Sequence, residues 1–297
     1  MASETELLVL PSVYRGPSRA LRLRRAMRRY PVASAAAFVI LAFIIIAVFA
    51  GVLAPYDPAK TEGAKRLADP SLSHPFGLDG LGRDVLSRVI YGSRVSLRVG
   101  LVAVFFAAGI GIPLGLISGY FGGWIDSVIM RSVDAVIAFP HLVLALTLVL
   151  VLGPSEINIM AAVGISSSPT YARLVRSQVL SLRSRDFVLA ARAMGANDRQ
   201  IIWKHVWPNT IPSVIVAASL TMGSAILAEA ALSFLGVGVR PPTPTWGRML
   251  NESFGFIYVQ PWLSFFPGLA IFLLTLSFNL LGDGLRDALD PRLRGQA

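Results

Sequence analysis

Residues 32–54, VASAAAFVILAFIIIAVFAGVLA, form a run of 23 consecutive residues without a charged side chain. A helix of about 20 residues, rising about 1.5 Å per residue, crosses the hydrocarbon core of a bilayer. The apolar region of a cleavable signal peptide is only about 7–15 residues long, so we expect this run to be a retained membrane helix. The run therefore predicts a membrane protein.

Five further uncharged, apolar runs follow along the chain, at residues 99–119, 135–152, 157–172, 210–228 and 261–282. The run 157–172 is the shortest and carries a Ser-Ser-Ser-Pro tract. Neighbouring helices can bond to the backbone groups that a kink at this proline leaves free. The whole chain of 297 residues is 54% hydrophobic and 15% charged, with no cysteine, which excludes a disordered or a disulfide-stapled protein. We predict an all-α, polytopic membrane protein with six transmembrane helices.

The charges indicate the orientation of these helices. Six spans place both termini on one side, and 18 of the 27 basic residues fall there, seven of them in the leader 1–31 and seven in the loop 173–209. The positive-inside rule then places both termini and that loop in the cytoplasm. The predicted parts are the leader 1–31, the first helix 32–54, an external loop 55–98, a core 99–282 and a tail 283–297. The net charge of +10 is thus mainly an orientation signal and does not favour nucleic-acid binding. We expect the arginine-rich leader to lie on anionic lipid headgroups.

The chain lacks the residues of an energy-coupling enzyme. It contains no Gly-x-x-x-x-Gly-Lys-Ser/Thr phosphate loop and only three lysines, and its three histidines are far apart. No piece between the uncharged runs is longer than 44 residues, which is too short for a separate domain. We expect no enzymatic activity, metal or cofactor in this chain, so an energy source or a soluble receptor must be a separate chain.

Residues 184–209 predict two short helices joined by a glycine. Phe187, Ala190, Ala191 and Met194 share one helix face, and Gly195 suits a left-handed C-terminal cap. Asn197 and Gln200 then have the spacing of a capping box, and we expect Pro208 to end the second helix. The small apolar face suits close approach of another protein, while the tryptophans at 203 and 207 suit a helix lying on lipid.

This segment resembles the EAA loop of ABC importer permeases, Glu-Ala-Ala-x-x-x-Gly followed by Ile-x-Leu-Pro, which docks into the nucleotide-binding subunit. The motif positions that match are Ala190, Ala191, Gly195 and Pro208, and those that differ are Leu189, His205 and Trp207. The resemblance implies a role in coupling to the nucleotide-binding subunit for Asp186, Leu189, Ala190, Ala191, Met194, Gly195, Ala196, Asp198, His205 and Pro208.

Other stretches are similar to the C-type subunit of dipeptide and oligopeptide permeases, in the peptide/nickel branch of the ABC importers. They include HPFGLDGLGRDVLSR at 74–88, PPTPTWG at 241–247 and NLLGDGLRDALDPR at 279–292. The resemblance implies a type I permease in a bacterial cell membrane that transports di- or oligopeptides or a related solute. It also implies four partners: a second permease of the B type, two ATPase subunits that bind ATP and Mg²⁺, and an external substrate-binding protein. The alternative is an ATP-independent secondary transporter or channel.

Two features inside the apolar runs need an explanation. Gly111, Gly115 and Gly119 recur every four residues, which permits close helix packing and is the interpretation that we favour over a role in lining the path. Glu229 is the only acid well inside an apolar stretch, where an ionisable group is unfavourable by about 2.5–3.5 kcal/mol. We therefore expect Glu229 to face the bundle interior, the translocation path or an arginine.

Overall fold

The structure is a computed structural model that describes residues 28–289, and all its regular elements in that range are helical. In chain order they are α2 Pro31–Val48, α3 Ala50–Leu53, η1 Gly63–Lys65, α4 Val85–Phe121, α5 Gly123–Ile137, α6 His141–Leu152, α7 Glu156–Leu182, α8 Asp186–Ala193, α9 Asp198–Gln200, η2 Ile201–Val206, α10 Trp207–Phe234, α11 Trp246–Ser253, η3 Phe254–Phe256 and α12 Trp262–Leu289.

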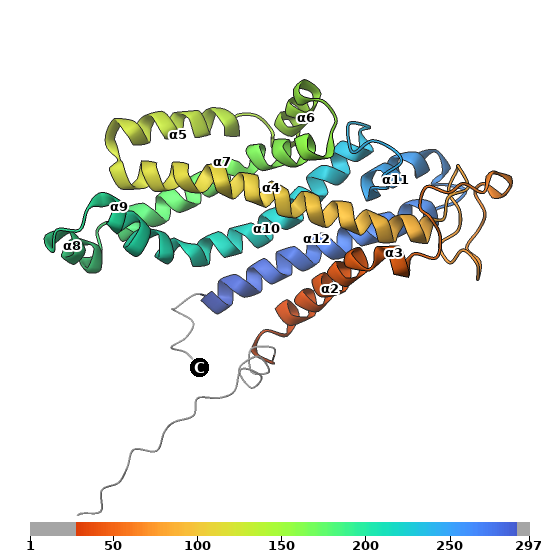
Figure 1. Ribbon diagram of the computed structural model, residues 1–297, viewed down its shortest axis with the longest axis horizontal. Helices are drawn as coiled ribbons and strands as arrows, with labels where there is room; N and C mark the ends of the chain where they lie inside the picture. Colours follow the sequence, from red (N-terminus) through yellow and green to blue (C-terminus); the bar gives the residue numbers. More distant parts are fainter. Residues whose placement is uncertain (1–27, 290–297) are drawn as a thin grey trace, which may run out of the picture.

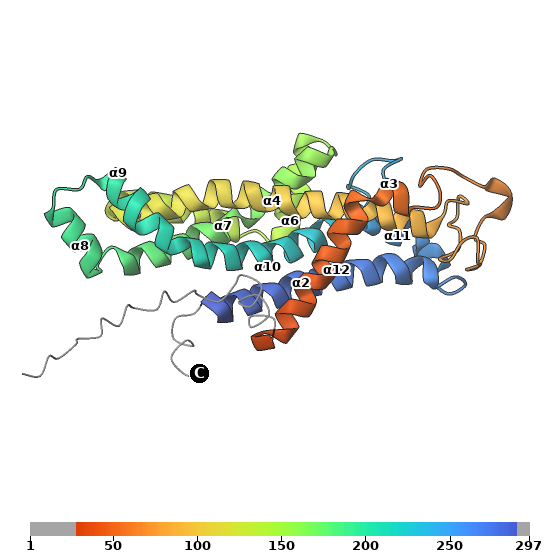
Figure 2. The same cartoon turned by 60° about the horizontal axis from the view of Figure 1, so that its bottom comes forward.

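The long helices lie side by side in an elongated bundle (Figures 1 and 2). One end of the bundle carries the short helices α8 and α9, and the opposite end carries α3, α11 and the loop that precedes α4. Helix α2 crosses α12 obliquely, and Ala33 packs against Gly284 where the two helices meet. The first described helix and the last are thus in direct contact.

Four helical segments are long and apolar enough to cross a membrane. They are α2, α4, α12 and the continuous helix Asp198–Phe234 formed by α9, η2 and α10. The pair α5 and α6 makes a fifth if it counts as one bent span. The described chain is therefore an all-helical protein with several candidate spans.

Helix α4 begins well before the uncharged run 99–119 that predicted it. The Asp84 side chain caps the helix by accepting a hydrogen bond from the Ser87 N–H, so the predicted loop 55–98 ends at residue 84. The charged side chains that interrupt the apolar pattern have partners within the molecule. Arg88 is buried in an ion-pair cluster, and Arg94 donates to the Ala47 and Val48 carbonyls near the end of α2.

The predicted span 135–152 is bent in the structure. Helices α5 and α6 meet at an angle of 90° across the short break 138–140. Pro140 explains the break, because proline has no N–H and disfavours a helical conformation at the residue before it. Helix α5 also begins at residue 123, well before the predicted start.

The helix does not end at Pro208, so the prediction that this proline ends the second helix of the segment 184–209 was wrong. A π-helical turn, Ile201–Val206, precedes it, and the Trp207 N–H bonds back to the Ile202 carbonyl. The wider turn accommodates a residue without an N–H, and the helix continues into α10. Similarly, α7 extends to residue 182, ten residues past the run 157–172.

The predicted terminal segments are only partly described. Of the leader 1–31, residues 1–27 lie outside the described residues. Helix α12 continues to Leu289, so the first seven residues of the predicted tail 283–297 are helical, and 290–297 lie outside the described residues.

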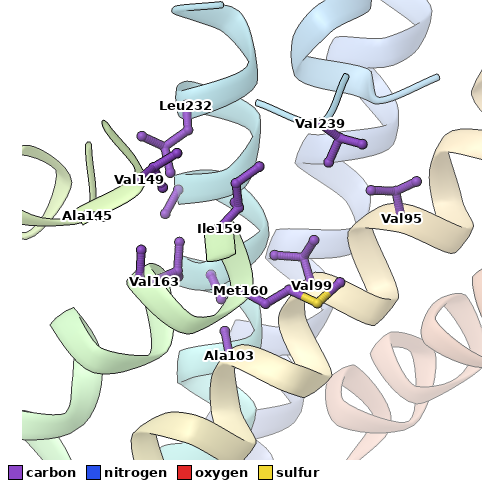
Figure 3. Close-up of a cluster of buried hydrophobic side chains, with 13 residues drawn as sticks. Val95, Val99, Ala103, Ala145, Val149, Ile159, Met160, Val163, Leu232 and Val239 are labelled. Carbon is purple, nitrogen blue, oxygen red and sulfur yellow. The ribbon is translucent and has the colours of Figure 1, made fainter. Parts of the chain in front are cut away.

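The bundle core has two kinds of packing. At its centre, apolar side chains from α4, α6, α7 and α10 interdigitate, among them Val99, Val149, Met160 and Leu232 (Figure 3). Towards the α8–α9 end, Gly115 and Gly119 of α4 face the backbone of α7 closely. An added Cβ would lie 2.6 Å from the Ala172 carbonyl oxygen at Gly115 and 2.9 Å from the Arg176 carbonyl oxygen at Gly119. This is the close helix contact that the glycine spacing predicted.

The loop before α4 is fixed to α11 by a cluster of charged side chains. Glu252 accepts hydrogen bonds from Arg83 at 2.6 Å, from Arg88 at 2.9 Å and from Arg248 at 2.9 Å. Asp79 pairs with Arg83 at 2.7 Å. Arg88 is 1% exposed, so these acids provide the charge compensation that a buried guanidinium requires.

Candidate functional site

The segment after α7 folds into the short helix α8 and a tight turn, as predicted, and the second helix begins at Asp198 and continues into α10. Gly195 has a φ of +85°, a conformation that favours glycine. The Ala196 N–H bonds to the Ala191 carbonyl at 3.1 Å, and the Gly195 N–H bonds to the Arg192 carbonyl at 3.0 Å. These two bonds form a Schellman cap, which satisfies carbonyls at the end of α8.

The capping box at the start of the second helix is also confirmed. The Asn197 side chain accepts from the Gln200 N–H at 2.9 Å, and the Gln200 side chain accepts from the Asn197 N–H at 3.2 Å. Both bonds connect residues three apart, so the local sequence is sufficient to specify them.

A polar network attaches this segment to the end of α4. The Tyr120 hydroxyl donates to the Asp198 carboxylate at 2.5 Å and accepts from Arg192 at 3.1 Å. Val188 and Ile201 are buried nearby in the same apolar cluster. Tyr120 thus links both short helices to α4. Sequence reasoning missed this residue, because the network joins positions 78 residues apart.

Four large apolar side chains of the segment are exposed. Phe187 and Leu189 are about half exposed, Met194 is 82% exposed and Trp203 is 57% exposed. They belong to the end of the molecule where α8 and α9 lie (Figure 1). We call the four residues the outer face.

The other predicted coupling residues are distributed around the outer face. Asp186, Ala190 and Pro208 are exposed. Ala191 is buried against the bundle, and Ala196 and His205 are half-buried. Of the predicted face of α8, only Ala191 therefore turns inwards.

Glu229 is completely buried in α10. Its Oε1 accepts a hydrogen bond from Ser233 at 2.7 Å, and within residues 28–289 its Oε2 has no partner. No arginine of the described residues pairs with it, so of the three predicted environments the structure supports the bundle interior. Glu229 does not line the groove described next.

A groove of about 1020 Å³ runs along the bundle between α7, α10 and α12. Its lining is rich in hydroxyl and amide groups: Ser167, Thr170 and Gln178 from α7, and Ser213, Thr221 and Ser224 from α10. Polar side chains are unfavourable against lipid, so this lining indicates a surface that faces water or protein. The α7 residues share one helix face, a spacing from which a polar stripe could have been predicted.

His141 lies at one end of this groove, where α6 begins. Its Nε2 is 2.9 Å from the hydroxyls of both Ser166 and Ser167. Each hydroxyl also donates to the Val163 carbonyl, at 2.9 and 2.8 Å.

An all-helical bundle with several candidate spans around a polar groove is the architecture of a membrane transport subunit. The family described as "Binding-protein-dependent transport system inner membrane component" matches residues 111–295. The family described as "N-terminal TM domain of oligopeptide transport permease C" matches residues 19–70. The chain belongs to the binding-protein-dependent inner membrane components.

Relatives of known name extend this similarity over most of the chain. The dipeptide transport system permease protein DppC of Alkalihalophilus pseudofirmus is 46% identical over 270 residues, which are 91% of this chain and 89% of the relative. The glutathione transport system permease protein GsiD of Escherichia coli O6:K15:H31 is 47% identical over 273 residues, 92% of this chain and 90% of the relative. The predicted resemblance to the C-type permeases of ABC importers is confirmed.

Solved structures of ABC transporters share the fold. An inward-facing form of the MetNI methionine ABC transporter matches with a TM-score of 0.57 and 20% identity, over 68% of this chain and 96% of that chain. An amino acid ABC transporter matches with a TM-score of 0.53 and 18% identity, over 69% and 95%. The family match and the named relatives identify this chain as a multi-pass inner membrane permease of a binding-protein-dependent ABC importer, rather than its ATPase or an ATP-independent transporter.

Proposed function

We propose that this permease carries di- or oligopeptides, or a related solute such as glutathione, across the membrane. The observation that carries the proposal is the identity of 46–47% over about nine-tenths of the chain with permeases named for dipeptides and for glutathione. The polar groove agrees with it, because hydroxyl and amide side chains can bond to peptide groups without selecting particular side chains.

In this proposal the chain crosses the membrane six times, with α7 as the sixth span beside the five candidates. Helix α7 is 27 residues long, which is sufficient. A helix with these polar side chains can cross the membrane because Ser167, Thr170 and Gln178 face the groove. Other polar groups are paired, as Arg176 is with Asp126 at 2.6 Å. Both termini and α8–α9 then lie in the cytoplasm, in agreement with the basic residues on that side.

The outer face receives an ATPase subunit, and a second permease of the B type completes the path around the groove. ATP and Mg²⁺ bind to the two ATPase subunits, and an external binding protein delivers the solute. Closure of the ATPase pair displaces α8 and α9, and the Tyr120–Asp198 bond passes the displacement to α4. An apolar surface outside the bilayer supports this assignment, because it is unfavourable in water unless covered.

The test is ATP-driven uptake by the complete complex in proteoliposomes. Gly195→Val places a β-branched residue at a φ of +85°, so the Schellman cap must change. We expect this variant to assemble and hydrolyse ATP but to lose most uptake. The matched control is Gly255→Val, because an added Cβ at Gly255 meets nothing within 4 Å and Gly255 lies at the other end of the bundle. Normal coupled uptake by Gly195→Val, or an active chain that purifies without an ATPase, would contradict the proposal.

A further inference from the structure

We propose that the groove favours solutes with a free carboxylate and holds that group successively at its inner end and at its cytoplasmic mouth. This inference rests on the proposed function and adds a chemical preference to the path itself. The first observation is electrostatic. Among the described residues that line the groove none is acidic, whereas Arg185 and Arg286 each carry a positive charge.

Neither arginine at the mouth forms an ion pair with another of the described residues. Nearby guanidiniums on α7 are paired, Arg173 with Asp134 and Arg176 with Asp126, each at 2.6 Å. Within residues 28–289, Arg185 and Arg286 form no ion pair and line the groove instead. An unpaired guanidinium offers a planar fork of donors that matches a carboxylate, so these two side chains form an anion-attracting mouth.

The inner end has a weaker positive field of different origin. His141 is the first residue of the 12-residue helix α6, whose first turn has N–H groups without intrahelical acceptors. The partial positive charge of a helix N-terminus favours an anion there. The two serines hold the imidazole in place, so the ring and the start of α6 together define this end of the groove.

The length of the groove requires that the two ends act one after the other. Ser167 and Arg185 are 18 residues apart along α7 and its C-terminal turn, a distance of about 27 Å along a helix. An extended dipeptide spans only about 7 Å. Its carboxylate can therefore contact one end at a time, and the stronger charge at the mouth draws an anionic group towards the cytoplasm.

The experiment compares alanyl-phenylalanine with its C-terminal amide in proteoliposomes that contain the full complex and saturating binding protein. The acid-to-amide uptake ratio is measured for the wild type and for the double variant Arg185→Gln/Arg286→Gln. The binding protein is the same in both, so its own preference cancels when the two ratios are compared. We expect the ratio to fall about tenfold in the variant, which is the size of effect that a lost bond to a charged group produces.

Two matched variants make the result specific. Arg185→Lys/Arg286→Lys keeps the positive charge and should retain most of the wild-type ratio. Arg131→Gln removes an exposed arginine of α5 that does not line the groove, and it should leave the ratio unchanged. ATP hydrolysis stimulated by the loaded binding protein should persist in all variants.

The possible failures are distinguishable. ATP-driven uptake with the same ratio in the wild type and the glutamine variant would overturn the carboxylate preference alone. A wild-type complex that imports neither probe would overturn the proposed peptide function and this inference with it. If the glutamine variant does not assemble, the single variant His141→Gln, at the inner end, provides a second measurement of the ratio, and an unchanged value there would overturn the role of that end.

Discussion

Gly115 provides a sharp test of the contact between α4 and α7. An added Cβ would lie 2.6 Å from the Ala172 carbonyl oxygen, 2.8 Å from the Val175 Cβ and 3.0 Å from the Arg176 nitrogen. Ordinary contact begins at 3.4 Å, and two of these atoms belong to the backbone of α7 and cannot rotate away. The helices must therefore separate by about 0.8 Å at this point in a Gly115→Ala variant, and overpacking of this kind destabilises a folded protein by about 1–3 kcal/mol.

The loss can be measured as a lower temperature of unfolding. The chain contains no cysteine, so Ala162→Cys adds one buried thiol on α7 whose labelling on heating reports unfolding of this chain. For a chain of this size, 1–3 kcal/mol corresponds to a fall in Tm of about 2–5 °C. The control is Gly109→Ala in the same helix, where an added Cβ meets nothing within 4 Å and no loss is expected. Equal Tm values for the two variants would refute the backbone contact.

Three further substitutions test other parts of the molecule. Tyr120→Phe removes the hydroxyl that joins Asp198 and Arg192, so uptake should fall several-fold while ATP hydrolysis persists. The control Tyr258→Phe, at a fully exposed ring, should change neither activity. Parallel loss of uptake and ATP hydrolysis in Tyr120→Phe would contradict a linking role. Glu252→Gln removes part of the negative charge that compensates the buried Arg88, and it should lower the free energy of unfolding by about 3 kcal/mol. The control Arg98→Gln breaks an exposed pair and should lower it by at most about 1 kcal/mol. Equal losses in the two variants would show that the buried cluster contributes no more stability than an exposed pair. Met194→Asp puts a charge on the outer face and should weaken co-purification of the ATPase. The control is Leu72→Asp, at an exposed position in the loop before α4, and undiminished co-purification of Met194→Asp would exclude Met194 from that contact.

The sequence predicts best what is specified over short distances. The Schellman cap at Gly195 and the Asn197–Gln200 capping box depend on residues at most five apart, and both are present. The uncharged runs locate spans but misplace their ends. Helix α4 extends 14 residues further because Arg88 and Arg94 find partners that are distant in the sequence.

Features built from several elements could not be predicted in this way. The groove takes its polar lining from α6, α7, α10 and α12, and only the packing decides which face of each helix points into it. Glu229 was considered for the translocation path because it is an acid in an apolar run. The structure places it in the interior, where its neighbour Ser233 is one turn away on the same helix.

The π-helical turn before Pro208 determines how a displacement can travel through this subunit. Without it, the proline would have divided the chain there, as Pro140 divides α5 from α6. With it, Asp198–Phe234 is one helix of 37 residues, a rod about 55 Å long. If such a rod pivots by about 5° at its middle, each end moves by about 2.4 Å, by simple trigonometry on that length. One arm of this lever begins at Asp198, and Thr221 and Ser224 of its other part line the groove, so in the proposed function a small push at one end changes the width of the groove directly.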